Sequence, residues 1–204
     1  MKAPLLAMMF AAAALTFADA PEAFAAATVG QPAPALKLVD STGQTRSLAE
    51  FAGKTVVLEW TNHECPFVKK HYGAANMQAQ QRDATADDVV WLTVNSSAPG
   101  KQGHVDGAAA DRIRGQARAA QTGYLLDPDG TAGRAYGAKT TPHMYVIDPK
   151  GVLLYAGAID SIPSADTADI AKATQYVPQA LAQLAAGKPV SVTVTRPYGC
   201  SVKY

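Results

Sequence analysis

The chain has 204 residues, 48% of them hydrophobic, and a formal net charge of +1 at pH 7. A chain of this length and apolarity can bury one substantial core, so we expect one folded domain and no extensive disorder. Lysine and arginine are scattered among a nearly equal number of acids, and this pattern argues against a nucleic-acid-binding surface.

The N-terminus has the three parts of a secretory signal peptide. The dipeptide MK is positively charged, residues 4–17 form an apolar run too short to span a bilayer, and AFA before Ala26 is a small-residue cleavage site. A buried N-terminal helix is the alternative. We therefore assign residues 1–25 to a signal peptide and residues 26–204 to one domain without a membrane span. No cysteine follows the apolar run, which excludes a lipoprotein, and we expect a periplasmic or secreted protein.

Beyond the signal peptide, apolar runs alternate with helical patterns. Residues 31–54 are punctuated by proline and glycine and predict a short edge hairpin. Further strands are predicted at residues 55–60, 88–96, 124–127, 143–148, 152–159 and 190–195. Helical segments are predicted at residues 66–83, 106–121, 128–138 and 165–187.

The order of these elements predicts the architecture. Strands separated by helices of this length are typical of parallel βαβ units. The DPKG turn at residues 148–151 instead joins two strands as an antiparallel hairpin. The sequence therefore predicts an α/β domain with a central mixed β-sheet and helices on both faces. No internal repeat or low-complexity linker divides it.

Cys65, one of two cysteines, falls where a strand has ended and a helix begins at Pro66. Unpaired backbone N–H groups and the helix dipole stabilise a thiolate at such a position. Lys69, Lys70 and His71 add positive charge one or two turns further along. We expect Cys65 to be a nucleophile whose pKa lies below the free value of about 8.5. A buried, inert cysteine is the alternative.

Two stretches carry a resemblance to a known family. VVLEWTNHECPFVKKHY (residues 56–72) leads a strand into a Cys-Pro turn, and YGAKTTPHMYVIDPKGVLLYAG (residues 136–157) follows later. Together they resemble the thioredoxin-fold redoxins, in particular the peroxiredoxin-like (alkyl hydroperoxide reductase/thiol-specific antioxidant) family. The resemblance implies a thioredoxin-like fold and a thiol oxidoreductase that needs no cofactor. It also implies a cis peptide bond between Thr141 and Pro142, lying against the active cysteine.

The chain departs from the family pattern at three positions. Val68 occupies the place of the second cysteine of a Cys-x-x-Cys motif, so no local disulfide can form. Asn62 stands where a typical peroxiredoxin has threonine, and it could still donate a hydrogen bond to a substrate. The arginine expected before strand 143–148 is not replaced. Whether the substrate is a peroxide or a disulfide therefore stays open, and an external thiol reductant is expected for both.

Cys200 is the second cysteine and lies close to the C-terminus. An even number of cysteines in an exported chain favours pairing. Gly199 and the short tail predict a mobile segment, residues 196–204, that could reach Cys65. We therefore predict that Cys200 is the resolving thiol. A free or intermolecular Cys200 is the alternative, because a disulfide requires a Cα separation that sequence does not establish.

The histidines support a rival hypothesis, a periplasmic copper-binding or copper-delivery protein on the same fold. Its ligand set would comprise His63, Cys65, His71, His143 and Cys200. Copper-delivery proteins normally carry a Cys-x-x-x-Cys pair, however, and Lys69 occupies its second position. The favoured interpretation has no metal, and in it His71 and His104 are solvated surface residues.

Overall fold

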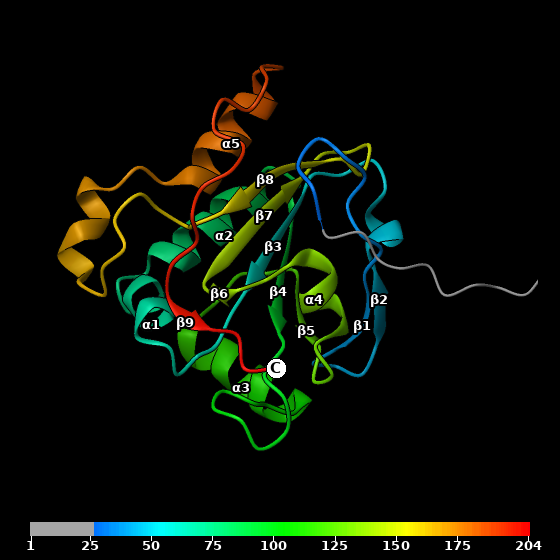
Figure 1. Ribbon diagram of the computed structural model, residues 1–204, viewed down its shortest axis with the longest axis vertical. Helices are drawn as coiled ribbons and strands as arrows, with labels where there is room; N and C mark the ends of the chain where they lie inside the picture. The colour runs from blue at the N-terminus through cyan, green and yellow to red at the C-terminus, as the bar shows by residue number, and fades with distance from the viewer. Residues whose placement is uncertain (1–26) are drawn as a thin grey trace, which may run out of the picture.

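A computed structural model describes residues 27–204, so the signal-peptide hypothesis for residues 1–25 lies outside the described residues. The main sheet has the strand order β2-β1-β5-β4-β3-β7-β8, and a separate ribbon pairs β6 with β9 (Figure 1). The strands are β1 (Lys37–Asp40), β2 (Thr45–Ser47), β3 (Val56–Trp60), β4 (Val90–Asn95), β5 (Gly123–Leu126), β6 (Thr140–Thr141), β7 (His143–Ile147), β8 (Leu153–Gly157) and β9 (Cys200–Ser201).

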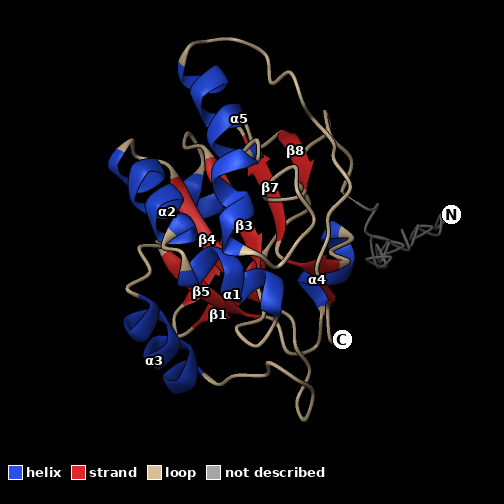
Figure 2. Cartoon of the chain, turned by 90° about the vertical axis from the view of Figure 1, so that its left-hand side faces the viewer, coloured by secondary structure: helices blue, strands red, loops and turns tan. Residues whose placement is uncertain are grey.

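Helices cover both faces of the sheet. They are α1 (Pro66–Gly73), α2 (Asn76–Ala86), α3 (Gly107–Ala117), α4 (Thr131–Tyr136) and α5 (Tyr176–Ala185), with short 3-10 helices η1 (Leu48–Phe51) and η2 (Thr167–Lys172). Figure 2 shows α1, α2 and α5 in front of the strands and α4 on the opposite side. None of the helices in residues 27–204 combines the length and apolarity needed to cross a bilayer.

The predicted mixed sheet is confirmed. Strands β3, β4 and β5 run parallel, β7 pairs antiparallel with β3 and β8 pairs antiparallel with β7, and β1 and β2 form the predicted edge hairpin. Every residue of β3, β4 and β7 is buried, as expected for strands covered on both faces. Leu58 and Trp60 face the core under α4, while Val57 faces the core under α2 and α5. The alternating direction of strand side chains thus divides β3 between two core layers.

Three predicted elements differ from the structure: two helices are interrupted and one strand is missing. The helix predicted at residues 66–83 is two helices, because Ala75 between them takes the left-handed conformation with φ 58°. The helix predicted at residues 165–187 is η2 followed by α5, and Gln175 between them forms an isolated bridge with Asp160. The strand predicted at residues 190–195 is absent apart from one isolated bridge. In each case tertiary contacts override a local pattern that continues across the break.

Glu59 of β3 is fully buried between the sheet and α2. Its carboxylate accepts hydrogen bonds from the indole of Trp91 and the hydroxyl of Tyr72, both at 2.9 Å, and from Thr93 and Gln81, both at 3.2 Å. Burial raises the pKa of Glu59 to about 7, although these four donors favour the charged form. The folded protein therefore binds a proton at pH values where the unfolded chain releases it.

This proton uptake predicts a specific pH dependence of stability. Between about pH 4.5 and 7 the folded state holds more protons at Glu59 than the unfolded state, so the free energy of unfolding falls as pH rises. The contribution of Glu59 is on the order of 3 kcal/mol. Glu59→Gln should remove it, because the amide stays neutral at every pH. Its oxygen can accept from Trp91 and Thr93, while its NH2 group can donate to the Tyr72 hydroxyl.

Urea unfolding at several pH values between 4.5 and 8 measures the effect. The stability difference between Glu59→Gln and the wild type should grow in favour of the variant as pH rises. Asp83→Asn, at an exposed carboxylate on α2, is the matched control and should show no such growth. A Glu59→Gln difference that stays constant across this range would contradict the account of the buried carboxyl.

Candidate active site

Cys65 caps the N-terminus of α1, immediately before Pro66. Its backbone is extended, with φ −68° and ψ 126°, and proline takes the first helical position, where its missing N–H has no partner to lose. The N–H of Cys65 donates to the carbonyl of Asn62 at 3.0 Å, which closes the turn after β3. The expected position at a helix N-terminus is therefore confirmed. The side chain is fully buried, which the sequence does not indicate.

Asn62 shapes this turn with its side chain. Its Oδ1 accepts the N–H of Glu64 at 2.9 Å, and its Nδ2 donates to the carbonyl of Gln102 at 3.2 Å. Gly103 lies so close that a Cβ there would fall 2.1 Å from Oδ1. Asn62 is 1% exposed. The amide predicted to contact substrate is thus engaged in two hydrogen bonds that hold the loop before Cys65.

The loop between β6 and β7 lies against the Cys65 sulfur. The peptide bond between Thr141 and Pro142 is cis, as expected from the resemblance. The Cys65 thiol donates to the carbonyl of Thr141 at 3.1 Å, and Thr141 is itself buried. Residues predicted to share the site across 76 positions of sequence are therefore in direct contact.

Strand β9 brings Cys200 to the same loop. Cys200 pairs antiparallel with Thr141, and Ser201 pairs with Thr140. Gly199 makes this approach possible, because its φ is 127° and a Cβ there would lie 2.1 Å from the Thr141 oxygen. Both cysteines are free, and each thiol shifts the pKa of the other. The tail predicted to be mobile is instead paired with the loop, so the two thiols are already neighbours.

The two thiols have opposite pKa shifts. Burial alone raises the pKa of Cys65, but hydrogen bonds from the Cys200 thiol, from the backbone N–H groups of Val68 and Cys200 and from the Thr141 hydroxyl lower it below its ordinary value. Burial, the hydrogen bond to Cys65 and the negative charge that Cys65 acquires raise the pKa of Cys200 to about 11. Cys65 is therefore the thiol that ionises first.

Lys70 and His71 do not have the positions predicted for them. Lys70 is buried, and its Nζ contacts Asp160 Oδ2 at 3.2 Å and the carbonyl of Ile162 at 3.3 Å. Its charge is thus engaged by Asp160. His71 is also fully buried, with Nε2 3.4 Å from the Tyr198 hydroxyl. Burial lowers the pKa of His71 to about 4, with Asp160 opposing this shift and Lys70 adding to it. The prediction of a solvated His71 is therefore wrong, whereas His104 is exposed.

Asp160 and Tyr198 also belong to the site, although no sequence motif marks them. Asp160 follows β8, and Tyr198 lies two residues before Cys200. The Tyr198 hydroxyl donates to Asp160 Oδ1. The sequence gives one local hint of this cluster. Lys70 lies three positions after Phe67 and therefore shares its apolar helix face, which is unusual for a solvated lysine.

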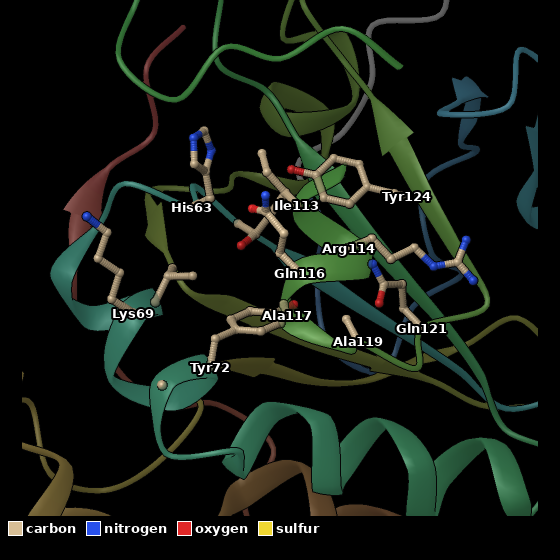
Figure 3. Close-up of a pocket in the computed structure, with 13 residues that line it drawn as sticks. His63, Lys69, Tyr72, Ile113, Arg114, Gln116, Ala117, Ala119, Gln121 and Tyr124 are labelled. Atoms are coloured by element: carbon tan, nitrogen blue, oxygen red, sulfur yellow. The ribbon is translucent and has the colours of Figure 1, made fainter. Parts of the chain in front are cut away.

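A pocket of about 360 Å³ lies between α1 and α3 (Figure 3). Its lining includes Val68, Lys69 and Tyr72 from α1 and Arg114 from α3, and it contains no acidic residue. Cys65 is not among the lining residues. The pocket is therefore beside the helix that carries the cysteine and does not open onto the sulfur.

The structure does not gather the ligands of the copper hypothesis. Within residues 27–204, no group of three histidine, cysteine or acidic side chains is placed to hold a metal ion. His143 Nδ1 instead contacts the Tyr145 hydroxyl at 3.1 Å and the Lys139 N–H at 3.3 Å. Burial, together with the charge of Lys139, lowers the pKa of His143 to about 4.

Solved structures with the same architecture include two proteins without an assigned activity. An uncharacterized conserved protein from Geobacillus kaustophilus is 22% identical, with TM-score 0.73 over 87% of this chain and 92% of that chain. A hypothetical protein from Sinorhizobium meliloti 1021 is 24% identical, with TM-score 0.68 over 88% of this chain and 96% of the other.

A third structure carries a functional name. The thioredoxin domain of a thiol-disulfide oxidoreductase from Bacteroides vulgatus is 17% identical, with TM-score 0.51 over 71% of this chain and 96% of that domain. These likenesses confirm the thioredoxin-like fold. No curated protein matches the chain.

The family follows from the sequence match. The AhpC/TSA family matches residues 29–156, a segment that begins before β1, includes Cys65 and the cis-proline loop, and ends within β8. This segment is more than half of the chain and agrees with the predicted resemblance. The protein therefore belongs to the AhpC/TSA family.

Proposed function

We propose that the protein is an exported thiol oxidoreductase that reduces a peroxide, with Cys65 as nucleophile and Cys200 as resolving thiol. The observation that carries the proposal is geometric: Cys200 pairs with Thr141, whose carbonyl contacts the Cys65 sulfur, so two free thiols meet at one loop. The pKa values of the two thiols are shifted in opposite directions. Membership of the AhpC/TSA family supports the same chemistry. Export is proposed from the signal-peptide pattern of residues 1–25.

In the first step the Cys65 thiolate attacks one oxygen of the peroxide. The O–O bond breaks, Cys65 is oxidised to a sulfenic acid, and the peroxide is reduced to an alcohol or water after its leaving oxygen takes a proton. The N–H groups of Val68 and Cys200 stabilise the attacking thiolate, as do the helix N-terminus and the Thr141 hydroxyl. The thiol with the lowered pKa is thus the one that meets the oxidant.

In the second step Cys200 attacks the sulfenic sulfur. An S–S bond forms between Cys65 and Cys200, and the sulfenic oxygen leaves as water with the Cys200 proton. Once Cys65 carries no negative charge, the charge effect that raises the Cys200 pKa disappears. Cys200 therefore becomes easier to ionise after the first step. An external thiol reductant then exchanges with the disulfide and restores both thiols.

The burial of Cys65 favours a small oxidant. Strand β9 and the cis-proline loop lie over the sulfur, and the Cys65 side chain is fully buried. A peroxide needs only a narrow approach, whereas a protein disulfide would have to displace β9 to align its sulfur with Cys65. Disulfide exchange with a protein substrate is the competing reaction, and direct comparison of the two rates distinguishes them.

The first prediction concerns thiol ionisation. The reduced wild type should ionise Cys65 below the free-thiol value of about 8.5, because its hydrogen bonds outweigh burial. Cys200→Ala removes one donor and should raise the Cys65 pKa, whereas Cys65→Ala removes a negative charge and should lower the Cys200 pKa. Ultraviolet titration of thiolate absorbance measures all three proteins. A Cys65 pKa at or above the free value in the wild type would contradict the proposed nucleophile.

The second prediction concerns turnover. Peroxide consumption with an added dithiol should fall to background in Cys65→Ser, which is nearly isosteric and is favoured at a helix N-terminus. Cys200→Ser should consume one equivalent of peroxide and then depend on direct attack of the added thiol on the sulfenic acid. Stopped-flow peroxide assays and circular dichroism provide the activity and the folding control. If the wild type does not react with peroxide, and Cys65→Ser loses only disulfide exchange, the peroxidase assignment is contradicted.

A further inference from the structure

The C-terminal segment, residues 195–204, runs from the body of the sheet across the active site. Figure 1 shows it in red, from its start beside β8 to β9 and the C-terminus. It is attached at its start, where Thr195 Oγ1 accepts the N–H of Ala158 at 2.8 Å. It is attached again at its end, where the Tyr204 hydroxyl donates to the carbonyl of Ala138 at 2.7 Å. Cys200 lies between these two attachments.

A third attachment lies next to Cys200, where the half-buried Tyr198 contacts a fully buried carboxylate. Asp160 receives the Tyr198 hydroxyl on Oδ1 and the Lys70 ammonium on Oδ2, the latter at 3.2 Å. His71 Nε2 lies 3.7 Å from the same Oδ2. The side chains of Lys70, His71 and Asp160 are fully buried. We call these four residues the Tyr198 anchor.

The Tyr198 anchor connects the two halves of the active site. Lys70 belongs to α1, five residues after Cys65, whereas Tyr198 lies two residues before Cys200. Burial and the neighbouring Asp160 carboxylate raise the pKa of Tyr198 well above its ordinary value, so its hydroxyl remains a donor. The resolving cysteine is thereby attached to the helix that carries the nucleophile.

Stability alone is a weak reason for such a cluster. Burying a carboxylate and an ammonium loses solvation free energy that offsets much of their mutual attraction. A buried ion pair therefore adds little net stability. A buried ion pair can instead fix one geometry among several packings. A cavity of about 650 Å³, lined in part by Asp160, Tyr198 and Gly199, adjoins the C-terminal segment. The segment therefore has room to shift if the anchor is lost.

We propose that Tyr198 is a positioning residue for the resolving step, whose hydroxyl, held by the buried Asp160–Lys70 pair, sets the approach of Cys200 to Cys65. The inference rests on the proposed function, because it concerns the step in which the Cys65 sulfenic acid and the Cys200 thiol form a disulfide and release water. Tyr198 touches no reacting atom in this step. It acts through the placement of Gly199 and Cys200.

Tyr198→Phe isolates the hydroxyl. The aromatic ring packs edge-on against Phe67 at 5.7 Å between centroids, and Lys70 Nζ lies 5.8 Å from its centre. Phenylalanine keeps both ring contacts and loses the hydroxyl, with its hydrogen bond to Asp160 and its 3.4 Å contact to His71 Nε2. Tyr204→Phe is the matched control, because it removes a hydroxyl from the same segment that donates to a neutral carbonyl. Gly199→Ala is the positive control for displacement, since its Cβ collides with the Thr141 oxygen.

The experiment separates the two chemical steps in the full chain. Reduced protein is mixed with one equivalent of hydrogen peroxide, and samples are quenched over time and analysed for sulfenic acid and disulfide by mass spectrometry. Tyr198→Phe should form the sulfenic acid at least as fast as the wild type and form the disulfide about tenfold more slowly, the effect of losing one hydrogen bond to a charged group. Tyr204→Phe should stay within about twofold of the wild type in both steps.

A second readout does not depend on peroxide chemistry. Alkylation of Cys65 by a small reagent should be about tenfold faster in reduced Tyr198→Phe, because the released segment uncovers the sulfur. If the wild type does not react with peroxide but Tyr198→Phe is still alkylated faster, the proposed function is rejected and the role of the Tyr198 anchor is retained. Disulfide formation and alkylation at wild-type rates in Tyr198→Phe would overturn the positioning role, as would equal slowing of both chemical steps.

Discussion

The antiparallel pairing of β9 with β6 is the constraint on which the rest of the site depends. It places Cys200 opposite Thr141, whose carbonyl receives the Cys65 thiol at 3.1 Å. The pairing requires Gly199, because a side chain there would collide with the Thr141 oxygen. Through it, a thiol near the end of the chain lowers the pKa of Cys65, whose side chain is buried. The position of Cys200, the ionisation of Cys65 and the access of other molecules to Cys65 thus depend on the pairing of β6 with β9.

Local sequence signals predict the frame of the site. The β-branched run before Cys65 and the proline after it place the cysteine between a strand and a helix, and the structure agrees. The mixed sheet follows from the order of apolar runs and the DPKG turn, because such signals depend on near neighbours in the chain. The cis bond at Pro142 comes from the family resemblance, since no local pattern distinguishes it from an ordinary proline turn.

Long-range contacts account for what the sequence does not predict. Lys70 and His71 lie on the polar side of a helical pattern and look solvated, yet they meet Asp160, 90 positions after Lys70. The Tyr198 contact to His71 crosses 127 positions. Their burial reverses the expected roles, because the charge of Lys70 is engaged by Asp160 and His71 is held neutral by a pKa of about 4. Residues 190–195 likewise have an alternating pattern typical of a strand. They form no strand, because the C-terminal segment takes a different path across the protein.

Disulfide mapping of the mildly oxidised wild-type monomer tests the account most directly. Peptides produced without reduction should contain one intramolecular bond, between Cys65 and Cys200, because β9 holds Cys200 opposite Thr141, whose carbonyl contacts the Cys65 sulfur. Dimers linked through Cys200, or a Cys65 that remains sulfenic until an added thiol arrives, would contradict the account. Either result would mean that the pairing of β9 with β6 covers Cys65 without bringing Cys200 into position to form a disulfide with it.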